Sequence, residues 1–188
     1  MPDKEIQELC RRIYSKHRAA LDLIYELRPD RQAEIRDALL EMIGADPDLT
    51  LDASTKTFIR FRPVSWDRPE LRRGQGWTKS GMMVLFEFDN SPSWKPNALG
   101  LGLWIGPGDE KVRRQIYEAA TRAGSPFTPN PKGLSVKWVS LFWKDILSPT
   151  DYGHLDLEAI QSRLQEAWSA FKSNELPFMN DAIDQVPL

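Results

Sequence analysis

The spacing of apolar residues changes part-way along the chain, and this change limits the fold more than any other feature. Up to Gly44, apolar residues recur every three or four positions, as on one face of a helix. Beyond Gly44, three stretches alternate instead: "TKTFIRFRP", "MMVLFEFDN" and "ALGLGLWIG". Alternation is typical of strands with one buried face. The chain must therefore combine an N-terminal helical part with a sheet.

Residues 1–44 predict two helices that form a helical hairpin. An apolar stripe from Ile6 to Tyr25 indicates one long helix, which Pro29 ends. Asp30 is a suitable cap for a second helix, which stops at Gly44. We expect the joint between them at "RPD".

Residues 49–147 predict a sheet core with one helix. The fourth strand is expected in "LSVKWVSLFWKDIL". Before it, Asp109 is placed to cap a helix reaching to about Ala123, with Gly124 closing it. Strands joined mostly by loops favour an antiparallel or mixed sheet. A parallel pair of the third and fourth strands stays open, and their helix would then make a right-handed crossover.

Residues 155–186 predict C-terminal helices. Asp156 starts a helix with Ile160 and Phe171 on its apolar face, and Pro177 separates a last short helix. We therefore expect a single α+β domain over residues 1–188. It would hold a four-stranded, mostly antiparallel or mixed sheet flanked by helices.

The composition is ordinary for a globular protein. Hydrophobic residues make up 41% and charged residues 28% of the 188 residues. No apolar run is long enough to span a bilayer, and the N-terminus lacks an apolar signal core. A single cysteine, Cys10, excludes an internal disulfide. We expect a cytoplasmic protein with no membrane partner, no cofactor and no metal site.

The turn Gly106-Pro107-Gly108 stands directly before a predicted helix, where a phosphate cradle would form. Pro107 lacks an N–H donor, and Asp109 and Glu110 already bring negative charge to that helix terminus. Neither of the common glycine-rich phosphate motifs can be placed here. The pattern favours a structural corner over an anion site.

Gly100 and Gly102 share one strand face with Trp104. A strand surface without side chains permits close approach by a helix, a Trp ring or a ligand. Together with Gly106 and Gly108 these residues form a candidate ligand or backbone-approach face. A helix packed on smooth backbone is the favoured interpretation.

Glu87 and Asp89 are the carboxylates nearest the expected strand core. A metal-dependent nuclease would place lysine two residues after a strand glutamate, and Asp89 stands there instead. The pattern favours an ion pair from Glu87 to Arg60 or Arg62 on a neighbouring strand. A metal-dependent enzyme using both carboxylates is a third alternative, so the chain is more consistent with a protein that is not an enzyme.

The segment from Lys56 to Lys79 is the best functional signal. It holds seven basic residues against two acidic ones, a net charge of +5. Cations interleaved with aromatic rings suit nucleic acid, because they neutralise phosphate and stack on bases. The predicted nucleic-acid-binding residues are Arg60, Arg62, Trp66, Arg68, Arg72, Arg73, Trp77 and Lys79.

The C-terminal region has the opposite charge. From Asp145 to Leu188 there are eight acidic residues and two basic ones, a net charge of −6. The basic segment could dock on this region of the same or another chain. The alternative function is therefore a protein-interaction or assembly subunit, such as a homodimer, that uses the first helix and the acidic helices.

The stretch from about 82 to 183 resembles a known region. The matching parts are "FEFDN", "IGPGDEKVR" before a helix, the "KW" strand and the closing "LPFMNDAI". They resemble the C-terminal accessory region of some bacterial PD-(D/E)xK nuclease-superfamily proteins. The catalytic core of that superfamily is missing, so no catalytic residue is carried over. The resemblance implies a non-catalytic nucleic-acid-binding accessory module in bacterial or phage DNA conflict, not a nuclease.

Overall fold

A computed structural model describes residues 3–27, 30–135 and 137–187 of the chain. The chain divides into two compact units, Met1–Asp30 and Arg31–Leu188. Each unit is described by itself.

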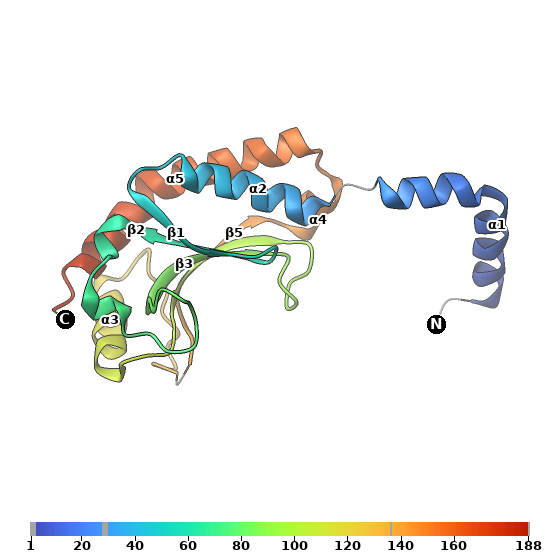
Figure 1. Cartoon of the computed structure of the whole chain (residues 1–188). Coiled ribbons are helices and arrows are strands. Elements are labelled where there is room, and N and C mark those ends of the chain that lie inside the picture. Colours follow the sequence, from blue (N-terminus) through green and yellow to red (C-terminus); the bar gives the residue numbers. More distant parts are fainter. Residues whose placement is uncertain (1–2, 28–29, 136, 188) are drawn as a thin grey trace. The chain divides into compact units, whose positions relative to one another are not determined.

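The first unit is the helix α1, Lys4–Glu26, which has a non-helical residue at His17. A kink at His17 divides α1 into two helical segments (Figure 1), so the predicted single long helix is not continuous, and none of the described residues of α1 is buried. Ile6, Ile13 and Ile24 are each about half exposed or more. Residues 28 and 29, in the predicted "RPD" joint, lie outside the described residues.

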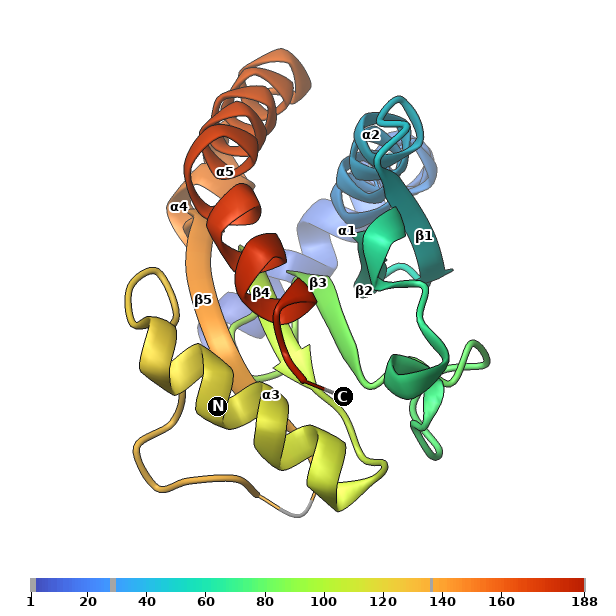
Figure 2. The same cartoon turned by 90° about the vertical axis from the view of Figure 1, so that its left-hand side faces the viewer.

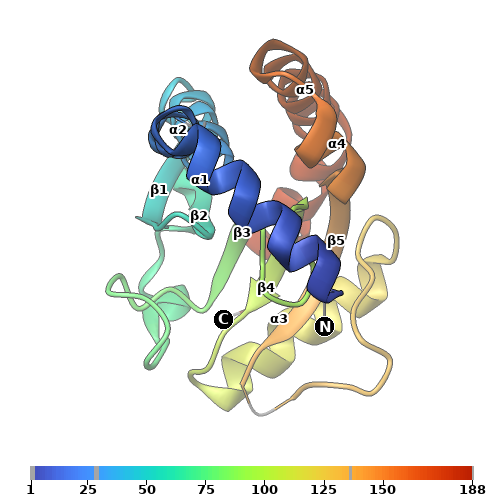
Figure 3. The same cartoon turned by 90° about the vertical axis from the view of Figure 1, so that its right-hand side faces the viewer.

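The second unit is built on an open antiparallel sheet. Its five strands are β1 (Leu49–Ser54), β2 (Phe58–Pro63), β3 (Val84–Asn90), β4 (Leu99–Ile105) and β5 (Val139–Leu147). They lie in chain order across the sheet (Figures 2 and 3). The α+β prediction is thus confirmed, with five strands instead of four. The third and fourth predicted strands are antiparallel, so the parallel alternative is wrong.

Two helices, α2 (Arg31–Gly44) and α5 (Leu157–Asp184), lie over one face of this sheet (Figure 1). The alternation seen in the sequence points Ile59 and Phe61 of β2 toward these helices, where both are fully buried. Phe61 stacks on Phe86 at a ring-centroid distance of 5.4 Å, and Phe86 meets Phe171 of α5 at 5.2 Å. The hydrophobic core therefore lies between the sheet and the two helices.

The helix α3 (Glu110–Ala123) connects β4 to β5 and contacts both β4 and α5. The Asp109 side chain accepts a hydrogen bond from the Val112 N–H at 3.1 Å. Gly124 ends the helix with a positive φ of 72°, a conformation that favours glycine. Both predicted caps are confirmed.

The C-terminal part differs from the prediction. A short helix α4 (Pro149–His154) precedes α5, and α5 continues through Pro177 without a break. The buried residues Met179 and Ile183, beyond the proline, hold the last turns against the core. This tertiary packing outweighs the local cost of proline in a helix.

The loop between β2 and β3 is long and contains two 3-10 turns, Val64–Trp66 and Pro69–Arg72. Its backbone is fixed by pairing: the Met83 N–H donates to Leu71 O at 2.9 Å, and Gly74 bridges to Gly108. No described helix is long and apolar enough to cross a membrane.

Candidate functional site

The sheet face that points away from α2 and α5 carries a pocket of about 400 Å³. Its lining residues come from β2, β3, β4 and three loops, and they are Phe58, Arg60, Trp77, Glu87, Asp89, Trp94, Trp104 and Trp138. Half of them are tryptophans. A concave, mostly apolar site with a few converging polar groups is the usual form of a small-molecule pocket. We call it the tryptophan pocket.

Glycines let tryptophan rings approach the backbone closely in and beside β4. A Cβ atom added at Gly100 would collide with the Trp143 ring, and one at Gly106 would collide with the Trp77 ring. The Trp104 ring covers Gly102 in the same way. The sequence allowed a helix, a tryptophan ring or a ligand next to these glycines and favoured a helix. The structure places tryptophan rings there.

Three of the rings, those of Trp94, Trp104 and Trp143, are in contact, and the tryptophan surface remains open to solvent. The ring centroids of Trp94 and Trp143 are 5.2 Å apart, and those of Trp104 and Trp143 are 6.5 Å apart. Trp94 is 62% exposed and Trp138 is 48% exposed. Exposed apolar surface gathered around a pocket marks a binding site more often than scattered single residues do.

Two carboxylates from β3, Glu87 and Asp89, form the acidic floor of the pocket, and both are buried. Arg60 lies directly opposite Glu87 on β2, and the two side chains form an ion pair. The predicted cross-strand pair is thus confirmed with Arg60 as the partner. The Arg60 guanidinium carbon also lies 5.2 Å from the Phe58 ring centroid and 5.4 Å from that of Trp77.

Asp89 has no ion pair of this kind among the described residues. It lies across from Phe58 on β2 and Gly100 on β4, and only 3% of it is exposed. Its Oδ1 atom accepts no hydrogen bond from the described part of the chain. Burial raises the pKa of Asp89 to about 7, helped by the charge of the nearby Glu87 carboxylate and by a side-chain hydrogen bond between the two groups, although Arg60 partly opposes the shift.

Arg113 of α3 holds one wall of the pocket in place. Its buried guanidinium donates to Gly106 O at 2.8 Å, to Ser135 O at 2.8 Å and to Lys137 O at 2.6 Å. The last two carbonyls belong to the loop that carries Trp138. Burial lowers the pKa of Arg113, but an arginine stays charged at neutral pH. Arg113 is therefore a positioning residue for this loop.

The predicted nucleic-acid-binding residues lie in three different places. Arg60 and Trp77 line the tryptophan pocket. Trp66 is fully buried in the core and stacks on Phe86 at 5.3 Å. Lys79 is exposed on the loop before β3.

The remaining arginines of that set contact the chain itself. Arg62 is buried and reaches Asp67 at 3.4 Å, and Arg72 also pairs with Asp67. These two arginines, Arg72 foremost through its hydrogen bond, lower the pKa of Asp67. Arg68 and Arg73 connect the loop between β2 and β3 to other parts of the chain. Arg68 donates to Ile183 O at 3.0 Å and Asp184 O at 3.2 Å, and Arg73 lies 3.6 Å from Asp109.

The Gly106-Pro107-Gly108 turn packs against the neighbouring loop as a corner. Pro107 O accepts a hydrogen bond from the Gln75 N–H at 2.9 Å, and a Cβ at Gly108 would come within 2.6 Å of Arg73 O. The N-terminus of α3 is capped by Asp109, whose pKa is lowered mainly by the Val112 N–H. These contacts support the structural-corner interpretation.

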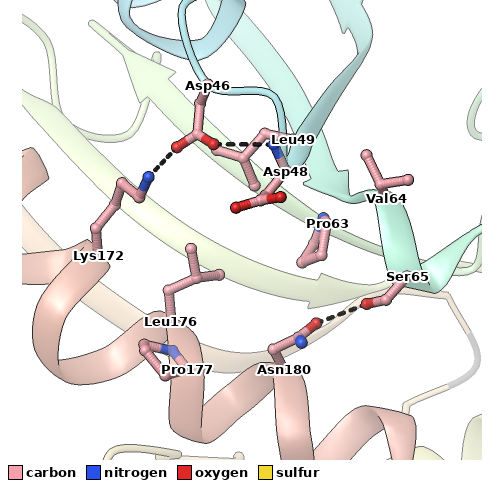
Figure 4. Close-up of a pocket in the computed structure, with 10 residues that line it drawn as sticks. All are labelled: Asp46, Asp48, Leu49, Pro63, Val64, Ser65, Lys172, Leu176, Pro177 and Asn180. Atoms are coloured by element: carbon pink, nitrogen blue, oxygen red, sulfur yellow. Dashed lines mark hydrogen bonds and ion pairs between the residues drawn. The ribbon is translucent and has the colours of Figure 1, made fainter.

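A second cavity of about 360 Å³ lies beside α5 (Figure 4). Lys172 of α5 pairs with Asp46 of the α2–β1 turn, and Asp46 also accepts the Asp48 N–H at 3.0 Å. Ser65 donates to Asn180 at 3.0 Å. These polar groups join secondary-structure elements to one another. We therefore place the candidate site at the tryptophan pocket.

Three residues of the pocket region were missed by the sequence analysis: Trp94, Trp138 and Trp143. Trp94 and Trp138 lie in irregular loops, where the spacing of apolar residues does not predict which way a side chain points. Trp143 alternates with Asp145 on β5, so its face was readable from the strand pattern. The richest unused signal was the content of seven tryptophans in 188 residues.

The described residues contain no cluster of three or more His, Cys, Asp or Glu side chains suited to a metal ion. Comparisons of the chain with protein-family models, curated proteins and solved structures give no significant match. They therefore do not bear on the resemblance to nuclease accessory regions.

Proposed function

We propose that the chain is a non-catalytic binding module that takes an organic ligand into the tryptophan pocket. The observation that carries this proposal is the gathering of five of the seven tryptophans on the sheet face away from α2 and α5. The other two, Trp66 and Trp168, are buried members of the hydrophobic core.

The physical argument rests on apolar area. A tryptophan ring can bury about 150–250 Å². Each Å² of apolar surface removed from water contributes about 25 cal/mol. Trp94 and Trp138 leave much of this area in water. A ligand that covers their rings would recover that free energy.

The proposal is tested by nuclear magnetic resonance of the indole N–H groups, with 2-phenylethanol as a neutral probe. The probe should shift the indole signals of Trp77, Trp94, Trp104 and Trp138 in a saturable way. The signals of Trp66 and Trp168, both in the core, should stay in place and act as internal controls.

Two variants locate the binding. Trp138→Ala should weaken binding of 2-phenylethanol several-fold, because it removes one wall of the pocket. Phe178→Ala removes an aromatic ring of similar exposure, 41%, outside the pocket and should leave binding unchanged. If neither 2-phenylethanol nor its amine analogue 2-phenylethylamine shifts an indole signal, or if both variants bind 2-phenylethanol equally well, the proposed site is wrong.

A second candidate function is binding of single-stranded nucleic acid on the same face. Exposed aromatic rings on an antiparallel sheet can stack on bases, and Lys137 Nζ lies 5.9 Å from the Trp138 ring centroid. We expect single-stranded DNA or RNA to bind more weakly at about 200 mM than at about 50 mM salt. Lys137→Glu should weaken that binding, and a chain that binds neither strand at low salt contradicts it.

A further inference from the structure

We propose that the natural ligand of the tryptophan pocket carries a protonated amine, which pairs with Asp89. This inference names the ligand class and rests on the binding function proposed above. The chemical group is a primary, secondary or tertiary ammonium with an apolar body.

The pocket already holds one cation in the arrangement that we infer. The Arg60 guanidinium pairs with the Glu87 carboxylate and lies near the faces of Phe58 and Trp77. A cation between a carboxylate and aromatic rings gains from ion pairing and from cation–π attraction. Arg60 of the chain itself therefore neutralises the Glu87 carboxylate.

The other half of the floor lacks such a cation. Asp89 is buried, and among the residues that the structure describes no lysine or arginine forms an ion pair with it. The charged groups nearest to it are Glu87 and Arg60, which already pair with each other. With both carboxyl groups ionised, the floor carries two negative charges against one positive charge. A ligand cation would restore the balance.

The walls beside Asp89 suit a cation as well as they suit an apolar body. Phe58 lies directly across from Asp89 on β2, and the Trp143 ring covers Gly100, its partner on β4. Trp94 and Trp104 pack against Trp143. Tryptophan gives the strongest cation–π attraction of the aromatic side chains.

The unpartnered Oδ1 atom of Asp89 narrows the ligand class further. This buried oxygen has no hydrogen-bond partner among the described residues, and a ligand N–H that donates to it would remove the free-energy cost of leaving it unsatisfied. A primary to tertiary ammonium has at least one N–H to donate, whereas a quaternary ammonium has none. We therefore expect tetramethylammonium to bind more weakly than amines that keep an N–H.

The experiment compares two probes of nearly identical shape, 2-phenylethylamine and 2-phenylethanol, on the full chain at pH 8. The amine should bind at least about tenfold tighter than the alcohol, because its ammonium makes a charge-assisted hydrogen bond. In Asp89→Asn the amine should bind no more than about twofold tighter than the alcohol, so the preference should vanish. Asp37→Asn removes an exposed carboxylate on α2 and should keep the preference.

The outcomes separate this inference from the proposed function. If both probes bind equally, or Asp89→Asn keeps the tenfold preference, the amine inference is wrong and the binding function stands. If neither probe shifts the indole signals of the pocket, the binding function fails as well. Thermal unfolding of Asp89→Asn confirms that the variant is folded before it is titrated.

A last arm distinguishes the two sources of such an amine. Nα-acetyl-lysine methylamide presents a protein side chain, and 2-phenylethylamine presents a free small molecule. Tighter binding of the lysine derivative indicates a peptide ligand, and tighter binding of 2-phenylethylamine indicates a metabolite. In either case, binding of the tighter amine should weaken in Asp89→Asn. If both amines bind Asp89→Asn as tightly as they bind the unchanged chain, the inference is overturned.

Discussion

Asp89 is a carboxyl group whose surroundings favour its neutral form. Burial and the Glu87 carboxylate raise its pKa from 3.8 to about 7. Between these two values the folded chain keeps a proton that the unfolded chain releases. The free energy of unfolding therefore falls as pH rises from about 4 to about 7 through this group.

Asp89→Asn should remove this loss of stability, because an amide resembles the neutral carboxyl group in shape. Relative to the unchanged chain, the variant should gain stability as pH rises, by no more than about 4 kcal/mol above pH 7. Urea unfolding at several pH values measures the difference. Parallel pH profiles for the two proteins would show that Asp89 has an ordinary pKa.

Gly100 is the residue on which the Trp143 ring depends. Gly100→Ala should displace that ring and cost about 1 kcal/mol of stability, as added atoms in a packed site do. The Trp143 indole N–H signal should move, since its hydrogen bond to Asp145 at 3.0 Å would be disturbed. Gly44→Ala is the matched control, because a Cβ at Gly44 meets nothing within 4 Å. Equal stability and unmoved indole signals in both variants would contradict this role.

At the scale of elements, the ion pair between Lys172 and Asp46 joins α5 to the turn after α2 (Figure 4). Asp46 is 7% exposed, so loss of its cation leaves a buried charge. Lys172→Met should destabilise the chain by about 1–2 kcal/mol, less than for a fully buried pair because Lys172 is partly exposed.

The matched control is the double variant Asp46→Asn with Lys172→Met, which removes both charges and should recover part of the loss. Chemical denaturation of the two single variants and the double variant gives the coupling between them. A coupling near zero would mean that the pair contributes nothing to stability.

Elements with clear local signals were predictable from the sequence. The caps of α3, Asp109 and Gly124, are local chemistry, and the pairing of Arg60 with Glu87 follows from two adjacent alternating strands. The strand β1 was missed because only Leu49 in it is buried, so its apolar alternation is weak. Pro177 indicated a helix boundary, but the burial of Met179 and Ile183 beyond it keeps the helix intact.

The candidate site was predictable only in part. Glu87, Asp89, Arg60 and the Gly100–Trp104 face were identified because strand alternation gives their direction. Trp94 and Trp138 come from loops separated by more than forty residues, and only the fold brings them together. The net charge of the basic segment is visible in the sequence, yet most of its arginines contact groups within the chain.

At the scale of the whole molecule, the second unit contains the sheet, the core and the tryptophan pocket. None of the described residues of α1 is buried. A chain of residues 31–188 should therefore fold on its own, with a melting temperature within a few degrees of that of the full chain. Differential scanning calorimetry measures this. A large drop in melting temperature would show that residues 1–30 stabilise the sheet unit.

The strand order of the sheet has a consequence for the route by which the chain folds. Each strand pairs with the next strand along the chain, so much of the sheet can form from contacts of short sequence separation, which favour rapid folding. The last strand, β5, can pair only after the intervening α3 and its flanking loops have closed the distance. Because β5 and the loop before it bring Trp143 and Trp138, the surface around the tryptophan pocket is complete only once β5 has paired with β4. A chain in which β5 has not yet paired would therefore hold most of the sheet without a complete pocket.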